Sequence, residues 1–125
     1  KGYKTIKKKI LIVEDEIIEA MFLGEILALW GYEICETATS GEDAIKEAEI
    51  HNPDLVLMDI NIHGKISGIE AAGKIHSRDG IPVIFMTGYS DEETRQKAYT
   101  AHPAGYFVKP LDYDKLKEEL MSIMY

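Results

Sequence analysis

Cysteine, basic residues and long hydrophobic runs are scarce in this sequence, and each shortage excludes a class of protein. The single cysteine among 125 residues, Cys35, excludes an internal disulfide and fits a reducing compartment, so we expect a cytoplasmic location. Lys and Arg number 14 against 22 Asp and Glu, and the formal net charge of −8 argues against direct binding of nucleic acid, because phosphates attract a basic surface. No apolar run approaches the length of a membrane-spanning helix and no signal-peptide pattern opens the sequence, so we expect no membrane insertion.

The hydrophobic content is high enough for a folded core. Hydrophobic residues make up 46% of the sequence, and 125 residues suffice for one domain with a core but not for two ordinary ones. We therefore expect a single domain over residues 1–125, with a basic, solvated lead-in at residues 1–8. Cys35, between Ile34 and Glu36, is predicted to be a small core residue.

Strand-like and helix-like segments alternate along the whole chain. Strands are predicted at residues 10–13, 32–37, 55–59, 81–86 and 105–108. Helices are predicted at residues 17–30, from a cap at Ser40 to about residue 51, from a cap at Ser67 to residues 79–80, from a cap at Ser90 to His102-Pro103, and after a cap at Asp112. Such alternation with short connections predicts an α/β fold in which helices cover both faces of a parallel sheet. For a single short domain we expect a flavodoxin-like three-layer sandwich, with five helices and a five-stranded parallel sheet of order 2-1-3-4-5.

Local signals refine these helices. Ser67 with Glu70, and Ser90 with Glu93, form the Ser-x-x-Glu pattern of a capping box, and Gly31 stands where a C′ glycine ends a helix. The helix at 17–30 is apolar almost all round, with only Glu19 and Glu25 charged. That composition indicates either deep burial or an outer face kept for a partner.

Reactive side chains follow four of the five predicted strands. Glu14 and Asp15 follow the first strand, Asp59 ends the third, Thr87 follows the fourth and Lys109 the fifth. Three carboxylates at one sheet edge repel one another unless a cation lies between them, and an all-oxygen donor set suits Mg²⁺. Lys109 adds a positive charge and Thr87 a hydroxyl donor, so the set suits phosphoryl transfer to a carboxylate nucleophile. Each residue alone has an ordinary interpretation as a helix cap, turn or surface residue, but chance explains their joint occurrence poorly.

Four motifs, in order, resemble the CheY-like receiver domain of two-component response regulators. They are Ile-Leu-Ile-Val-Glu-Asp-Glu at 10–16, the strand ending in Asp59, Met86-Thr87-Gly88, and Tyr106-Phe107-Val108-Lys109-Pro110, and the match spans essentially the whole chain. The resemblance implies that Asp59 accepts a phosphoryl group from a phosphohistidine on a histidine kinase or histidine phosphotransfer protein.

The same resemblance assigns roles to the residues around Asp59. It implies that Glu14, Asp15, Asp59 and the backbone carbonyl of Asn61 hold Mg²⁺. It also implies that Lys109 pairs with the acceptor and then with the phosphoryl group, and that the Lys109-Pro110 bond is cis. Such a domain catalyses its own phosphorylation and dephosphorylation but does not turn over a small substrate.

The resemblance also implies a conformational switch that begins with Thr87. Thr87 would move to bond the phosphoryl group and Tyr106 would turn inward behind it, changing a readout surface made by the fourth helix, the fifth strand and the fifth helix. The residues expected on that surface are Arg95, Tyr99, Tyr106 and Tyr113. The segment 60–68 departs from the family, because it has no Met-Pro and is about one residue longer, which leaves the shape of the loop and any role of Lys65 open.

Three alternatives compete with a phosphorylated receiver. A pseudo-receiver would act as a protein-interaction module without phosphate. An Asp-nucleophile phosphatase would carry Asp-x-Asp after its first strand, whereas Asp59 ends the third, and a flavodoxin would not place Glu14-Asp15-Glu16 beside a phosphate. The scattered positions of His51, His63, His76 and His102 argue against a histidine metal site.

The output and the cognate kinase are not readable from the sequence, which fits a stand-alone receiver as well as a fragment of a longer regulator or hybrid kinase.

Overall fold

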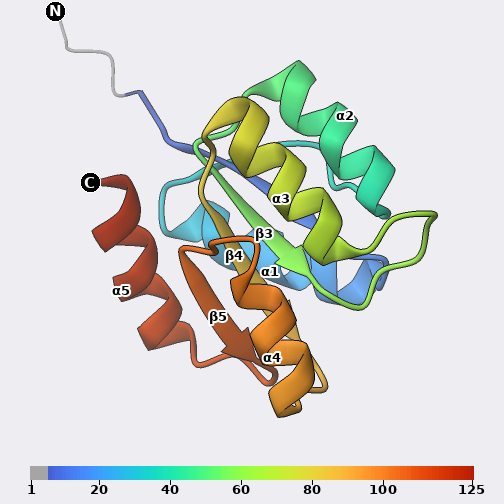
Figure 1. Cartoon of the computed structure of the whole chain (residues 1–125). Coiled ribbons are helices and arrows are strands. Elements are labelled where there is room, and N and C mark those ends of the chain that lie inside the picture. Colours follow the sequence, from blue (N-terminus) through green and yellow to red (C-terminus); the bar gives the residue numbers. More distant parts are fainter. Residues whose placement is uncertain (1–5) are drawn as a thin grey trace, which may run out of the picture.

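A twisted parallel sheet lies at the centre of the computed structural model, which describes residues 6–125 (Figure 1). The strands are β1 (Lys9–Val13), β2 (Glu33–Ile34), β3 (Leu55–Asp59), β4 (Val83–Thr87) and β5 (Gly105–Val108). The helices are α1 (Ile17–Leu29), α2 (Gly41–His51), α3 (Gly68–Asp79), α4 (Glu92–Tyr99) and α5 (Tyr113–Met124). The strand order is β2-β1-β3-β4-β5 with parallel pairing throughout, which confirms the predicted flavodoxin-like topology. Residues 1–5 of the predicted basic lead-in lie outside the described residues.

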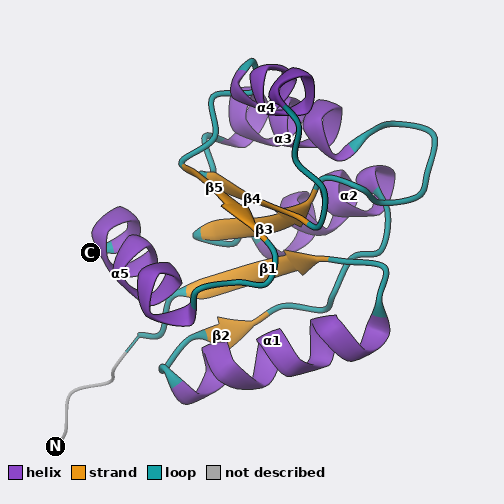
Figure 2. Ribbon diagram, turned by 90° about the horizontal axis from the view of Figure 1, so that it is seen from below, coloured by secondary structure: helices purple, strands orange, loops and turns teal. Residues whose placement is uncertain are grey.

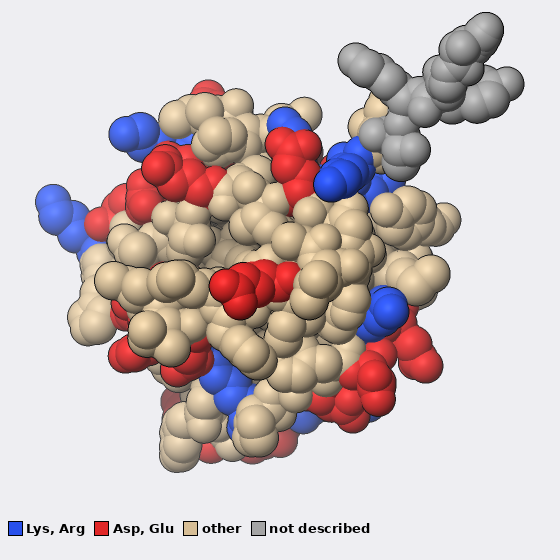
Figure 3. Space-filling model, turned by 180° about the vertical axis from the view of Figure 1, so that it is seen from behind, with Lys and Arg blue, Asp and Glu red and all other residues tan. Residues whose placement is uncertain are grey.

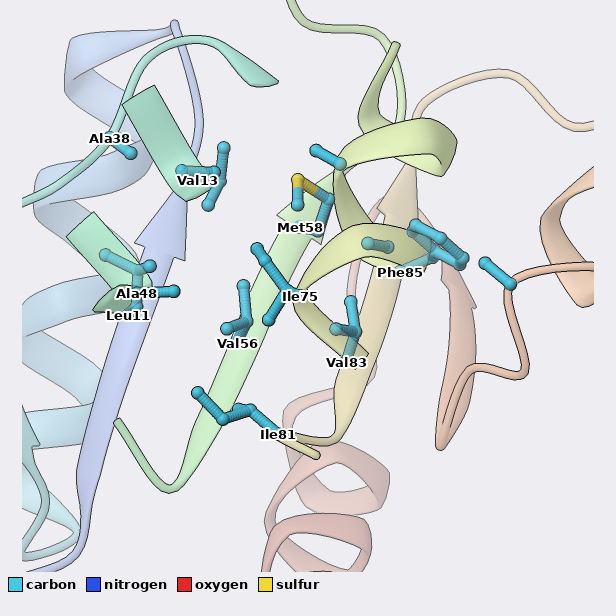
Figure 4. Packing of buried hydrophobic residues seen from close by; sticks show 14 of the residues in the cluster. Leu11, Val13, Ala38, Ala48, Val56, Met58, Ile75, Ile81, Val83 and Phe85 are labelled. Atoms are coloured by element: carbon cyan, nitrogen blue, oxygen red, sulfur yellow. The ribbon is translucent and has the colours of Figure 1, made fainter. Parts of the chain in front are cut away.

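Helices cover both faces of this sheet, with α1 and α5 on one side and α2, α3 and α4 on the other (Figure 2). Successive strand side chains point to opposite faces, so each buried strand contributes to two cores. On the α2–α3 side, Ile75 of α3 packs over Val56 and Met58 of β3 (Figure 4). On the other side, Leu55 and Leu57 of β3 pack with α1 and α5. All five residues of β3 are buried, as the unbroken apolar run predicts.

Two strands differ from the prediction by two or more residues at one end, whereas β1 differs only by the additional Lys9. β2 contains only Glu33 and Ile34 instead of residues 32–37, because it pairs with β1 alone and lies at the sheet edge. The chain leaves the ladder after Ile34 and pairs again only at Ala38, opposite Val13. β4 begins at Val83, two residues later than predicted, because Pro82 has no N–H to donate to the ladder.

The helix caps agree with the sequence at all but one position. Ser67 and Glu70 form the predicted capping box, and Gly31 has φ +98 in the left-handed region expected of a C′ glycine. The N-cap predicted for the fourth helix is wrong by one residue: Asp91, not Ser90, is the N-cap of α4, and its carboxylate accepts the Thr94 N–H at 2.7 Å. A carboxylate is the stronger acceptor at a helix N-terminus. The helix also ends at Tyr99, before the predicted end at His102-Pro103.

Helix α1 is buried on one side only. Ala20, Leu23 and Leu27 are buried against the sheet. The outer face carries five large, solvent-exposed apolar side chains: Ile17, Ile18, Met21, Phe22 and Leu29. Of the two interpretations offered for this helix, deep burial is therefore wrong. No helix within residues 6–125 has both the length and the apolar character needed to span a membrane.

Candidate functional site

The Lys109 ammonium group lies between carboxylates from different parts of the chain. Its Nζ donates to Glu14 Oε1, just after β1, at 2.8 Å and to Asp59 Oδ2, at the end of β3, at 2.9 Å. It also donates to Glu19 Oε1 of α1 at 2.7 Å. The order β1-β3 places Glu14 and Asp59 side by side at the carboxyl edge of the sheet, where α/β proteins bind ligands. The sequence predicts the contact of Lys109 with Asp59 but not the contact with Glu19.

Burial sets the electrostatics of this cluster. Glu14 is 3% exposed and Asp59 is 5% exposed. Burial raises the pKa of Glu14 to about 7, although hydrogen bonds from Lys109 and from the Glu16 N–H oppose the change. Burial lowers the pKa of Lys109, but its hydrogen bonds to three carboxylates outweigh burial and hold that pKa above its ordinary value of 10.5. Lys109 therefore stays protonated and acts as the cation between the acids.

Thr87 is connected to Asp59 through Asn61. The Asn61 N–H donates to Asp59 Oδ1 at 2.8 Å, while its side-chain Nδ2 donates to Thr87 Oγ1 at 3.2 Å. The buried Thr87 hydroxyl donates to the Tyr89 carbonyl at 2.6 Å and accepts the Tyr89 N–H at 3.2 Å. The sequence does not indicate that the Asn61 side chain joins the two strand ends.

Asp15 lies at the rim of the cluster and is paired with a histidine. Its carboxylate contacts Nδ1 of His63, an exposed residue of the β3–α3 loop. In this arrangement, no group of three or more His, Cys, Asp or Glu side chains among residues 6–125 is placed to hold a metal ion. The donor chemistry nevertheless fits Mg²⁺, because Glu14 and Asp59 share one ammonium group and supply the hard carboxylate oxygens that this ion prefers. A metal ion would have to replace Lys109 and His63 as the partners of these acids.

The long loop between β3 and α3 is held by α2. The Glu42 carboxylate accepts the backbone N–H of Lys65 at 3.1 Å and that of Ile66 at 3.4 Å. Gly64 has φ +125, and a Cβ there would lie 2.5 Å from Glu42 Oε1. Glycine thus permits both the backbone turn and the close approach of the carboxylate. The loop departs from the family pattern in sequence, and Glu42 explains how it is ordered without proline.

We expect Glu42→Ala to speed amide hydrogen exchange at Lys65 and Ile66, because their acceptor is lost. These hydrogen bonds also lower the pKa of Glu42 below its ordinary value of 4.5. A lowered acid pKa means that the protection is complete above pH 4.5 and is lost as pH falls through the lowered value. Exchange followed by NMR at several pH values measures both effects. Glu49→Ala, at the far end of α2, is the control, and equal exchange in the two variants would contradict the role given to Glu42.

Tyr106 lies outside the cluster and contacts α4. Its hydroxyl is 2.7 Å from Ser90 Oγ, its ring stacks on Tyr99 with centroids 5.9 Å apart, and the Arg95 guanidinium lies 5.3 Å from the ring centroid. Three residues of the predicted readout surface are therefore neighbours. Tyr113 differs, because it packs edge-on against Phe22 of α1, with centroids 6.1 Å apart. The Lys109-Pro110 peptide bond is cis, as the resemblance implies.

Family comparison agrees with this topology. The family model described as the response regulator receiver domain matches residues 10–121. The chain therefore belongs to the receiver-domain family of response regulators. The matched region contains all ten helices and strands except the first residue of β1 and the last turn of α5.

Curated relatives and solved structures are consistent with the family. The transcriptional regulatory protein PdtaR of Mycobacterium tuberculosis is 37% identical over 112 residues, which are 90% of this chain and 54% of PdtaR. The chemotaxis protein CheY of Treponema pallidum is 34% identical over 119 residues, covering 93% of this chain and 82% of CheY. This chain thus spans about half of PdtaR.

The same fold is found in solved receiver domains. The signal receiver domain of a modulated diguanylate cyclase from Desulfovibrio desulfuricans superposes with a TM-score of 0.89 at 33% identity, covering 95% of this chain and 94% of that one. A CheY-like receiver domain from Methanospirillum hungatei gives a TM-score of 0.85 at 30% identity, with 94% and 93% covered. The receiver fold therefore extends over nearly the whole of this chain.

Proposed function

We propose that this receiver domain takes a phosphoryl group from a phosphohistidine onto Asp59. The observation that carries the proposal is that the buried Asp59 carboxylate accepts a hydrogen bond from Lys109 at the carboxyl edge of the sheet. In the transfer, an Asp59 oxygen forms a bond to phosphorus while the bond from phosphorus to the histidine nitrogen breaks. Lys109 remains protonated and neutralises charge on the transferred oxygens, so the reaction needs mainly positioning and positive charge.

Mg²⁺ is the proposed cofactor. Glu14, Asp15, Asp59 and the backbone carbonyl of Asn61 would hold it. When bound, the ion supplies positive charge to the phosphoryl oxygens and to the acids that otherwise depend on Lys109. The chain's own part is to keep Glu14 and Asp59 buried together, so that their oxygens face one shared cation.

Phosphorylation is proposed to switch the α4–β5–α5 surface through Thr87. A phosphoryl group adds about −1.5 to −2 charges and new acceptor oxygens beside the Thr87 hydroxyl, which then has a stronger acceptor than the Tyr89 carbonyl. Movement of Thr87 disturbs the segment that carries Ser90, the hydroxyl partner of Tyr106. Tyr106 then turns inward and its stack with Tyr99 is lost.

The proposed partner is a histidine kinase or a histidine phosphotransfer protein, with an output domain or downstream protein responding to the switch. The exposed apolar face of α1 starts next to the site, because Ile17 and Ile18 follow Asp15 by two and three positions. Figure 3 views the molecule from behind Figure 1, the side on which α1 lies, and shows a largely uncharged surface that is crossed by an acidic side chain near its centre and has more acidic than basic side chains toward its edges. A partner surface with apolar residues and a basic rim would fit this face.

The direct test is phosphorylation by a small donor. We expect the protein, incubated with Mg²⁺ and acetyl phosphate, to gain the mass of one phosphoryl group. Asp59→Asn should abolish the gain, because an amide is not a nucleophile. Intact mass spectrometry measures the product. No gain in the wild-type protein would favour the pseudo-receiver, and a gain that survives Asp59→Asn would place the acceptor elsewhere.

A further inference from the structure

Glu19 is the one partner of Lys109 that is open to solvent. Its side chain is 53% exposed, whereas the side chains of Glu14 and Asp59 are 3% and 8% exposed. Its contact with Lys109 Nζ, at 2.7 Å, is nevertheless the shortest of the three. An ammonium group has three N–H donors, and all three are used here. Lys109 therefore has no donor left for another acceptor while these contacts last.

The space around this contact allows the pair to move. A cavity of about 440 Å³ lies between α1 and the β5–α5 turn, with Glu19 and Lys109 among its lining residues. Its other walls are largely apolar and include Phe22, Leu23, Met86 and Leu111. Glu19 can thus swing away from Lys109 without breaking core packing, while Glu14 and Asp59 are fixed at the ends of buried strands.

We propose that Glu19 is a positioning residue that restrains the Lys109 ammonium group and limits its availability to an incoming phosphoryl group. This inference rests on the proposed function of Asp59. An anionic donor entering the site meets the Glu19 carboxylate beside the ammonium group that it needs. The donor must displace that carboxylate or tolerate its negative charge. Glu19 consequently slows phosphorylation of Asp59.

Glu19→Gln tests this, because it keeps the side-chain length and removes the charge. Glu25→Gln is the matched control, since Glu25 is an exposed acid of the same helix and its loss changes the net charge equally. We expect Glu19→Gln to raise the second-order rate constant for phosphorylation of Asp59 by acetyl phosphate about two- to five-fold over the control, the size of the effect of an exposed ion pair. High salt should reduce this gain, because it screens exposed charges.

A second measurement examines Lys109 without phosphorylation. The NMR signal of the Lys109 ammonium protons should exchange faster with water in Glu19→Gln than in the wild-type protein or in Glu25→Gln. Equal phosphorylation rates and equal exchange in the two variants would overturn the proposal. Failure of the wild-type protein to accept a phosphoryl group would instead contradict the function of Asp59, and the ammonium exchange would still decide whether Glu19 restrains Lys109.

Discussion

Glu14→Gln should make the metal-free protein more stable above pH 7 and leave its stability nearly unchanged near pH 4.5. Burial raises the pKa of Glu14 from 4.5 to about 7, so between these values the folded protein binds a proton that the unfolded chain has released. The stability linked to that proton is complete below pH 4.5 and is lost as pH rises through 7. Glutamine is neutral at every pH and avoids this loss.

The size of the effect follows from the same shift. One pKa unit corresponds to about 1.4 kcal/mol, so the full shift sets an upper value of about 3 kcal/mol. Because the variant also replaces a charged acceptor of Lys109 by a neutral one, we expect a net gain of about 1–3 kcal/mol in the free energy of unfolding. Lys109 keeps Asp59 and Glu19 as partners.

Urea unfolding with a chelator present, near pH 4.5 and above pH 7, measures this difference. Glu25→Gln serves as the control, because it makes the same substitution at an exposed acid of the neighbouring helix α1. A Glu14→Gln variant that is less stable than the wild-type protein above pH 7 would contradict the argument. It would mean that the ion pair with Lys109 outweighs the cost of burying the charge.

The charged form of Glu14 lowers the stability of the metal-free protein, but the proposed reaction uses it. Three acids at one sheet edge are held together only when a cation lies among them, and in the metal-free protein Lys109 is that cation for two of them. His63 is the partner of the third, Asp15. In the proposed reaction, a metal ion must replace Lys109 and His63 as the partners of these acids. A site of this kind is expected to be less stable than a neutral version of itself.

The fold could be predicted because its main signals are local. The run from Leu55 to Met58, with turn residues before it, is typical of a strand buried on both faces, and its terminal carboxylate marks the sheet edge where α/β proteins bind ligands. The error at the start of α4 arises because the contact that decides between two possible caps is not local. Ser90 and Asp91 both suit an N-cap, and the choice depends on Tyr106, which engages the Ser90 hydroxyl from a strand 16 residues away.

The placement of residues in the candidate site could be predicted only for those at strand ends, and their roles stay predictions. Glu19 was noted in the sequence as one of two charges on an apolar helix, but its contact with Lys109 spans 90 residues and depends on how α1 lies against the sheet. Glu42 gave no signal, because its role depends on the path of a loop 23 residues further along. A lone acid on an apolar helix near the acidic strand end is the one clue that could have suggested Glu19.

Gly68→Ala should weaken both the fold and the proposed phosphorylation, because Gly68 packs directly against the backbone that carries the acceptor. A Cβ at this position would lie 2.8 Å from the carbonyl oxygen of Asp59 and 3.1 Å from that of Ile60. These are backbone atoms at the end of a buried strand and cannot rotate away. We expect a loss of about 1–3 kcal/mol in the free energy of unfolding, the usual cost of overpacking a well-packed interior.

Gly73→Ala is the matched control on the same helix. A Cβ at Gly73 meets no atom within 4 Å, so alanine there should stabilise α3 by about 0.5–1 kcal/mol through its greater helix propensity. The two variants make the same chemical change on α3, and only one of them presses on Asp59. Urea unfolding and the rate of phosphorylation by acetyl phosphate should be measured on both.

The phosphorylation rate separates displacement of the acceptor from general destabilisation. If the methyl group shifts the Asp59 backbone by about 1 Å, the rate in folded protein should fall by up to about a hundred-fold, because transfer depends on alignment of the nucleophile. Gly73→Ala should keep the wild-type rate. A Gly68→Ala protein that is fully folded and phosphorylated at the wild-type rate would show that the backbone at the end of β3 can shift to accommodate the methyl group. The rigidity of the strand, which is buried along its whole length, would then not be what positions Asp59.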